Sequence, residues 1–353
     1  MLRKISFSAM ALVCLTQAKA QDSTKTAEPV KTTTITGSVD VYYRFNFANA
    51  KSTLSTNNAT SFTNSHNSFE LGMASVKVAH SFGKIGAVVD LGFGSRAREF
   101  SYNEDGITQA VKQAYVTFAP SSKVTFTMGK FGTHVGYELL DPQLNRNYSM
   151  SYMFSYGPFS HTGLKMDVAV SGNFGFMLGV ANPTDYISAP FEKKFFIGQL
   201  HYATTNGKFT AYFNFVGGKD TSKTGQAQYD LVAIAKVSDK FSIGFNATLK
   251  NVKPDGGTRE NFKGAALYLN VDPTEKVGFT VRGELFDDKK NVTGYFGTKL
   301  YEATATLNLK PMSGLMIMPE LRLDGASDPY FTKHDGAGTK STFSFLLAAV
   351  YSF

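Results

Sequence analysis

The chain has 353 residues, of which 42% are hydrophobic, 14% aromatic and 18% charged, and its formal net charge is +8. The high aromatic content and the modest charge exclude a disordered chain and a coiled coil. The mean hydropathy of −0.15 argues against a protein that crosses a membrane with helices.

The first twenty residues (1–20) have the layout of a signal peptide. Arg3 and Lys4 precede an apolar run from Ile5 to Leu15, and Ala18-Lys19-Ala20 carries the small residues of a signal-peptidase site. We therefore expect export and cleavage before Gln21. Cleavage would leave 33 basic against 28 acidic residues, a net charge of +5.

Cys14 is the only cysteine of the chain. A lipoprotein anchored through it is an alternative, which its position inside the apolar run disfavours. Cleavage would leave an exported protein without disulfides or a cysteine metal site. Residues 21–34 are small and polar without apolar periodicity, and they predict a flexible periplasmic leader.

Apolar and polar residues alternate from residue 35 to the end, residue 353, the period of strands with one apolar face. In the first such segment Val39 and Val41 share the apolar face, and Asp40 and Arg44 share the polar one. The predicted strands cover residues 35–47, 67–82, 85–97, 109–118, 123–131, 158–170, 174–182, 193–204, 208–217, 226–237, 241–250, 260–271, 276–287, 296–309, 314–325 and 341–353.

The connections alternate between short turns rich in Gly, Pro, Asn and Asp and longer polar loops. An even number of strands near ten residues with this alternation predicts an all-β fold, a transmembrane antiparallel up-and-down β-barrel of about 16 strands. Within 67–82 the apolar face changes phase, which indicates a bulge. The alternative is a soluble, secreted β-sandwich or β-helix, but a sandwich has edges to protect and does not require this alternation of connections.

The last segment ends on an aromatic residue. Phe343, Phe345, Leu347, Tyr351 and Phe353 share one face, and this pattern resembles the C-terminal strand signal that the barrel-assembly machinery recognises in outer-membrane proteins. The resemblance implies the outer membrane of a Gram-negative bacterium, with both termini periplasmic, short turns on the periplasmic side and long loops outside.

A more specific resemblance surrounds the connection after strand 123–131. It rests on Gly129-Lys130-Phe131, Gly136, Glu138, the run Asn147-Tyr148-Ser149-Met150-Ser151-Tyr152-Met153-Phe154, Gly157-Pro158 and His161-Thr162-Gly163. These residues resemble the core of the putative β-barrel porin-2, OmpL-like family, and alternating strands extend the resemblance over most of the chain. Members commonly carry a basic residue where this chain has Met150, although Arg146 lies nearby. The resemblance implies a barrel and says little about the transported solute.

About sixteen strands enclose a lumen too wide for their own side chains to fill, so we expect an aqueous channel for passive diffusion of small hydrophilic solutes or ions. Charged residues on the polar faces are the expected pore-lining set: Asp40, Arg44, Asp90, Arg96, Lys165, Asp167, Arg282, Glu284, Glu320, Arg322 and Asp324. Their near-balance of sign predicts weak selectivity or paired charges. The simpler reading is that they wet the inner wall and pair across strands.

The loop at residues 133–157 is the candidate constriction. It carries Asp141, Arg146, Tyr148, Tyr152 and Tyr156, a mixture suited to narrowing a lumen. The alternative, a loop that packs on itself at the outer rim, stays open because composition does not reveal an inward fold.

Catalysis is not expected. His134 and His161 flank this loop with Asp141 between them, so an acid–base pair is conceivable, but no nucleophile elbow or metal-type histidine spacing accompanies them. We expect no catalytic residue, no cofactor and no metal site.

The expected partners are outer-membrane lipid, the barrel-assembly machinery and small solutes, and a homotrimer is plausible for a barrel of this size. Scattered Lys and Arg residues argue against nucleic acid. The alternative function is a closed structural or adhesive barrel whose external loops bind partners. Against it, residues 51–64 and 335–340 are dominated by Ser, Thr, Asn and Gly, which suits solvated loop tips.

Overall fold

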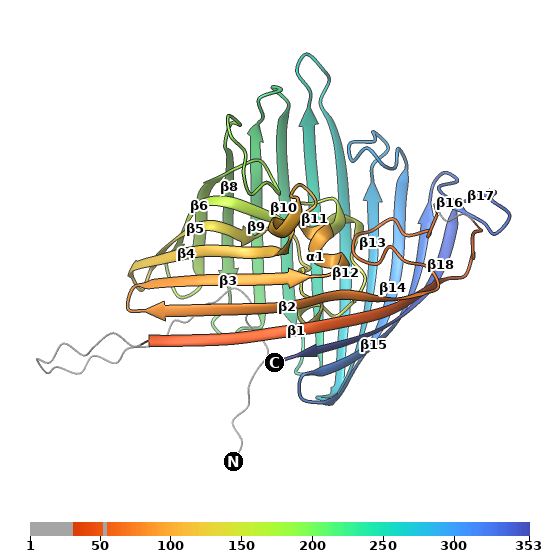
Figure 1. Ribbon diagram of the computed structural model, residues 1–353, viewed down its shortest axis with the longest axis horizontal. Coiled ribbons are helices and arrows are strands. Elements are labelled where there is room, and N and C mark those ends of the chain that lie inside the picture. The colour runs from red at the N-terminus through yellow and green to blue at the C-terminus, as the bar shows by residue number, and fades with distance from the viewer. Residues whose placement is uncertain (1–30, 52–54) are drawn as a thin grey trace, which may run out of the picture.

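A computed structural model describes residues 31–51 and 55–353. Sixteen antiparallel strands form one closed barrel, in which the first strand pairs with both the second and the last (Figure 1). The barrel strands are β1 (Lys31–Asn46), β2 (Ser68–Phe82), β3 (Ile85–Phe93), β4 (Val111–Ser121), β5 (Val124–Gly132), β6 (Ser160–Ala169), β7 (Phe174–Ala181), β8 (Phe195–Ala203), β9 (Phe209–Lys219), β10 (Gly225–Lys236), β11 (Phe241–Lys253), β12 (Glu260–Thr274), β13 (Val277–Asp287), β14 (Lys299–Met312), β15 (Leu315–Ala326) and β18 (Ser341–Ser352).

The predicted fold class is thereby confirmed, and each predicted strand corresponds to one barrel strand. The first strand begins at Lys31, so it includes the last four residues of the expected leader, 31–34. The rest of that leader and the expected signal peptide lie outside the described residues. The third strand ends at Phe93 rather than at residue 97.

Closure of the barrel uses the last residue of the chain. Gly37 and Phe353 exchange two backbone hydrogen bonds of 3.0 Å each, beside the register pairs Val39↔Tyr351 and Tyr43↔Leu347. A closed sheet leaves no strand edge with unpaired N–H and C=O groups, which is the condition for crossing a bilayer with strands.

The two faces of the wall differ as the alternation predicts. On β13, Phe279 and Leu285 are exposed on the outside, whereas Thr280, Arg282 and Glu284 are buried on the inside. The bulge predicted within 67–82 is confirmed, since the register with β1 skips Gly72 between the pairs Asp40↔Met73 and Val41↔Leu71. An apolar outside and a polar inside are the pattern of an outer-membrane barrel.

The long connections lie at one end of the barrel, here called the loop end, and carry the remaining elements. These are the helices α1 (Ser95–Phe100) and α2 (Tyr152–Ser155), the 3-10 helices η1 (Gly106–Ala110) and η2 (Pro142–Leu144), and a hairpin of β16 (Phe331–Thr332) and β17 (Gly338–Thr339). Among the described residues, no helix combines the length and the apolar character needed to cross a membrane.

Candidate functional site

The connection between β5 and β6, residues 133–159, folds inside the barrel and is here called the inner loop. Near its start, His134 Nε2 lies 3.0 Å from the carbonyl oxygen of Phe215 on β9, and the Gly136 amide donates to Asp230 on β10 at 3.0 Å. Further along, Asn147 Nδ2 donates to Thr306 on β14 at 2.6 Å. The inner loop therefore follows the inner wall across strands that lie far from β5 in the barrel.

Arg282 on β13 makes a further attachment through several hydrogen bonds. Its Nη1 donates to Glu138 Oε1 at 2.5 Å and to the carbonyl oxygen of Ser149 at 2.8 Å, and its Nε donates to Glu302 Oε1 at 2.5 Å. The guanidinium is fully buried, so these partners replace its lost hydration. One wall arginine thus ties together both arms of the inner loop.

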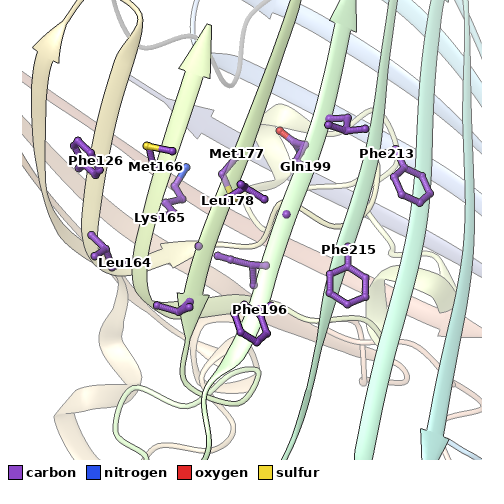
Figure 2. Close-up of a pocket in the computed structure, with 15 residues that line it drawn as sticks. Phe126, Leu164, Lys165, Met166, Met177, Leu178, Phe196, Gln199, Phe213 and Phe215 are labelled. Atoms are coloured by element: carbon purple, nitrogen blue, oxygen red, sulfur yellow. The ribbon is translucent and has the colours of Figure 1, made fainter. Parts of the chain in front are cut away.

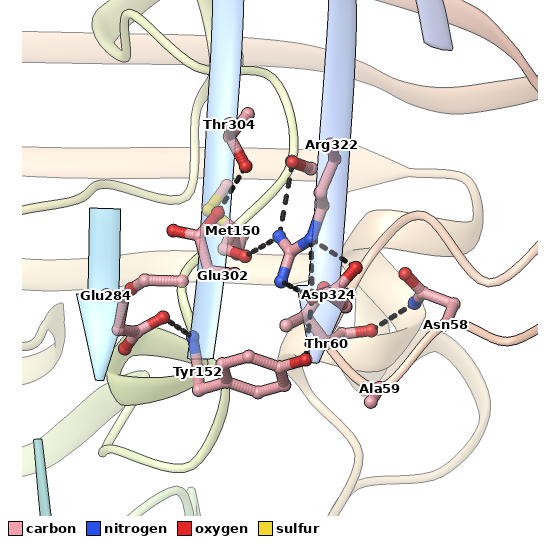
Figure 3. Close-up of polar contacts among 12 residues, drawn as sticks. Asn58, Ala59, Thr60, Met150, Tyr152, Glu284, Glu302, Thr304, Arg322 and Asp324 are labelled. Carbon is pink, nitrogen blue, oxygen red and sulfur yellow. Dashed lines mark hydrogen bonds and ion pairs between the residues drawn. The ribbon is translucent and has the colours of Figure 1, made fainter. Parts of the chain in front are cut away.

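A second attachment joins the inner loop to β13 and β15 (Figure 3). The amides of Tyr152 and Met153, at the start of α2, donate to the Glu284 carboxylate at 2.6 and 2.7 Å. The Tyr152 hydroxyl donates to Asp324 at 2.6 Å, and Arg322 holds that carboxylate while donating to the Met150 carbonyl oxygen at 2.6 Å. A carboxylate is a favourable partner for free amides at a helix start.

Tyr148 makes the third attachment, to the strands β15 and β1 on either side of β18. Its amide donates to Glu320 on β15 at 2.9 Å, and its hydroxyl donates to Asp40 on β1 at 2.5 Å. The Arg96 guanidinium lies 4.8 Å from the Tyr148 ring centroid, and Arg96 Nε lies 3.9 Å from the same Asp40 oxygen. Burial raises the pKa of Tyr148 well above its ordinary value, so the phenol keeps its proton and acts as the donor.

The predicted location of Arg96 on a strand was wrong. It lies on α1, because the chain leaves the sheet at Gly94, where φ is 128°. A Cβ at Gly94 would press against the backbone of Gly72, so this close approach requires glycine. Arg96 still projects toward Asp40, although from a helix and not from the wall.

Sequence reasoning missed Lys112, which binds Asp90 at 3.0 Å and Asp141 of the inner loop at 2.5 Å. Strict alternation would place Lys112 on the outer face with Val116. The register between β3 and β4 shifts at this point, pairing Asp90 with Gln113 and Leu91 with Val111, and this irregularity brings Lys112 inside. Glu138 was also missed as a site residue, because its partner Arg282 lies 144 residues away.

Arg44, which was predicted to line the pore, binds the loop that follows β1. Its Nη1 donates to the carbonyl oxygens of Thr56 and Ser65 at 2.9 and 2.8 Å, and its Nη2 donates to that of Asn57 at 3.2 Å. Arg44 therefore holds the loop between β1 and β2 at the barrel mouth.

The predicted pore-lining residues fall into two groups. Most are buried beneath the inner loop or other loops: Asp40, Arg44, Asp90, Arg96, Arg282, Glu284, Glu320, Arg322 and Asp324. Lys165 and Asp167 on β6 pair with one another at 2.9 Å and keep 22% and 43% of their side chains exposed. On the inner loop, Asp141 keeps 18% and Arg146, paired with Asp272 at 2.5 Å, keeps 29%. These four are the predicted charges that water can reach.

The three tyrosines predicted for the constriction fix the position of the inner loop. Tyr148 and Tyr152 are fully buried, and Tyr156 donates to the Ala59 carbonyl oxygen at 3.0 Å and packs edge-on against Phe296. His134 and His161 lie with ring centroids 5.2 Å apart, and His161 Nε2 lies 3.2 Å from Thr133 Oγ1 at the base of the loop. Asp141 binds Lys112.

The outer face of the wall carries an apolar hollow. This hollow of about 670 Å³ lies across β5 to β9. The outward side chains Leu178, Phe196 and Phe213 are among those that line it (Figure 2). Its lining is almost wholly apolar, which does not suit a hydrophilic solute. Within residues 31–51 and 55–353 there is no cluster of three or more His, Cys, Asp or Glu side chains arranged for a metal ion.

Solved structures of bacterial outer-membrane proteins share this fold. An anion-selective porin from Comamonas acidovorans aligns with a TM-score of 0.64 at 11% identity, covering 92% of this chain and 100% of that one. The outer membrane channel DcaP of Acinetobacter baumannii aligns at 0.63 and 12%, covering 92% and 97%. OmpT of Vibrio cholerae, in a trimer form, aligns at 0.60 and 11%, covering 92% and 99%. At such identities the likeness establishes the fold alone.

No curated protein was found to match the sequence. A family model, however, matches residues 32–353. This range covers the whole barrel except its first residue, Lys31. The closed sixteen-strand barrel, its polar interior and this match together show that the chain belongs to the putative beta-barrel porin-2, OmpL-like family of outer-membrane porins.

Proposed function

We propose that this porin is a passive diffusion channel for small hydrophilic solutes or ions, whose narrowest part is formed by the inner loop. The observation that carries the proposal is the attachment of residues 134–153 to the inner faces of β9, β10, β13, β14, β15 and β1. A loop fixed at so many points would be rigid and would narrow the lumen, as a selectivity element requires.

The charges that water reaches set the expected selectivity. Lys165 and Arg146 are basic, Asp167 and Asp141 are acidic, and each is paired with an opposite charge. Paired charges of both signs give a weak preference, in contrast to a ring of one sign. The buried arginines Arg282 and Arg322 hold the loop, and we do not assign them to ion selection.

We infer the surroundings of the channel from sequence and family. Residues 1–20 would direct export, residues 21–30 would remain as a leader, and both termini would lie in the periplasm. Phe353, paired with Gly37, would complete the strand that the barrel-assembly machinery recognises. The exposed apolar outer wall would contact outer-membrane lipid. A homotrimer is supported by the trimer form described for the similar OmpT barrel.

Conductance of the folded protein in a planar lipid bilayer, with the reversal potential under a salt gradient, tests this proposal. Discrete current steps with a small reversal potential are expected. Lys165→Glu should move the reversal potential toward cation preference, whereas Lys263→Glu, at an exposed wall position, should leave it unchanged. A folded barrel that carries no current would favour the alternative, a closed structural or adhesive barrel.

A further inference from the structure

A second cavity, of about 570 Å³, lies at the loop end between the wall and two external loops. The wall contributes Tyr42 and Glu70, the loop after β1 contributes Phe62, and the connection from α1 onward contributes Arg98 and Tyr102. The floor of the cavity adjoins the inner loop, because Tyr42 contacts Tyr148 with ring centroids 5.5 Å apart. The volume falls within the range of small-molecule binding sites.

The cavity exists because β3 is shorter than its neighbour. β3 pairs only with residues 74–82 of β2, so residues 68–73 have no strand beside them on that side, and α1 packs there. Ser95 Oγ donates to the Leu71 carbonyl oxygen at 3.0 Å, which satisfies one backbone group of this unpaired stretch.

The walls of the cavity are firmly held. Arg44 fixes the loop after β1 through the Ser65 carbonyl oxygen. Glu99 on α1 accepts from the Phe62 amide at 2.8 Å and from Asn64 Nδ2 at 3.0 Å, so the two external loops are bonded to each other. Hydrogen bonds between the segments around the cavity thus fix its shape.

Two charges of opposite sign are left for a ligand. Glu70 and Arg98 line the same cavity, and across residues 31–51 and 55–353 neither side chain takes part in an ion pair or hydrogen bond. Glu70 and Arg98 form no ion pair with each other, so their charged groups are not in contact. Glu99, in contrast, is saturated by the loop amides.

We propose that this cavity binds small zwitterionic solutes of the amino-acid type before they enter the channel. The ammonium group would face Glu70, the carboxylate would face Arg98, and the rings of Tyr42 and Tyr102 would pack against the aliphatic part. A zwitterion satisfies both charges at once, which a neutral sugar or a simple ion does not. The role in transport rests on the proposed function, but binding does not.

Equilibrium dialysis of labelled alanine against the full-length folded protein in detergent tests the inference. Alanine should bind saturably, and Glu70→Gln or Arg98→Gln should each weaken binding about tenfold, the loss of one charge-assisted contact. Alaninamide, which keeps only the positive charge, should respond to Glu70→Gln and not to Arg98→Gln. N-acetylalanine, which keeps only the negative charge, should respond in the opposite way.

Glu275→Gln and Arg259→Gln, both at exposed positions away from the cavity, are the matched controls and should bind alanine as the parent does. Absence of saturable alanine binding, or equal binding by the Glu70→Gln/Arg98→Gln double variant, would overturn the inference. Conductance of the same preparations separates the two proposals. A conducting barrel that does not bind alanine refutes only the cavity assignment, and a barrel that binds without conducting refutes only the channel.

Discussion

The Tyr148 hydroxyl donates a hydrogen bond to Asp40 at 2.5 Å, although 108 residues separate the two in the chain. Asp40 lies on the first strand and Tyr148 in the middle of the inner loop, so this contact joins the loop to the strand that closes the barrel. Both side chains are fully buried. A buried carboxylate needs its donors, and Tyr148 supplies the shortest contact that Asp40 makes.

Tyr148→Phe should therefore loosen the inner loop without unfolding the barrel. Loss of a buried hydrogen bond to a charged group costs about 1.5–3 kcal/mol. The folded barrel migrates as a compact form in gel electrophoresis, and we expect this form to be lost at a lower heating temperature than in the parent. We also expect a larger or noisier single-channel conductance. Tyr202→Phe, at an exposed outer position, is the control. Unchanged conductance would mean that this contact does not fix the loop.

Gly72→Ala tests the same contact from the opposite side. A Cβ at Gly72 would overlap the Asp40 carboxylate and lie 2.7 Å from the Tyr148 hydroxyl oxygen. The variant should match Tyr148→Phe in gel mobility and conductance, because in both the carboxylate loses its donor. Gly172→Ala, whose Cβ would meet no atom within 4 Å, should behave as the parent does. A silent Gly72→Ala would show that the wall yields easily here.

Arg282→Gln should be the most destabilising single change in the inner-loop attachments. It would leave the buried carboxylates of Glu138 and Glu302 without their cation, and breaking a buried pair in this way costs about 3–5 kcal/mol. Thermal loss of the compact form is the measurement, with Arg259→Gln as the exposed control. A second substitution, Glu138→Gln, should recover part of the loss. Equal stability of Arg282→Gln and the parent would contradict the assigned role.

His134 predicts an effect of acid on the base of the inner loop. Burial lowers the pKa of His134 to about 4, below its ordinary value near 6.5. The unfolded chain therefore binds more protons between these values, and stability present above pH 6.5 is lost as the pH falls toward 4, by at most about 3 kcal/mol. His134→Gln, which keeps a donor for Phe215, should flatten this part of the profile of thermal stability against pH. A profile unchanged by His134→Gln would remove His134 as its cause.

The alternation of apolar and polar residues, together with the even number of strands and the alternation of short and long connections, was enough to predict the barrel, because a wall strand places every second residue on its outer face. It failed where the backbone departs from the regular pleat. The turn at Gly94 places Arg96 on a helix, and the register shift beside Asp90 brings Lys112 inside. Neither irregularity can be detected from the local alternation of apolar and polar residues.

The inward fold of the inner loop could not be predicted for a different reason. Its partners are single side chains on distant strands, such as Arg282 for Glu138 and Asp324 for Tyr152, and pairing between them depends on the closed barrel. Sequence named both sets of residues, the wall charges and the loop tyrosines. It did not reveal that Tyr148 binds Asp40 and that Tyr152 binds Asp324.

Labelling of η2 in the inner loop tests the central claim most directly. Leu144, on η2, is exposed, so Leu144→Cys in a Cys14→Ser background offers a single thiol to a bulky methanethiosulfonate reagent without disturbing the attachments. Thr258→Cys, in the exposed loop between β11 and β12, is the control. If the inner loop narrows the pore, labelling at residue 144 should lower single-channel conductance stepwise, and labelling at 258 should not. Full labelling at 144 with unchanged conductance would show that solutes do not pass the inner loop.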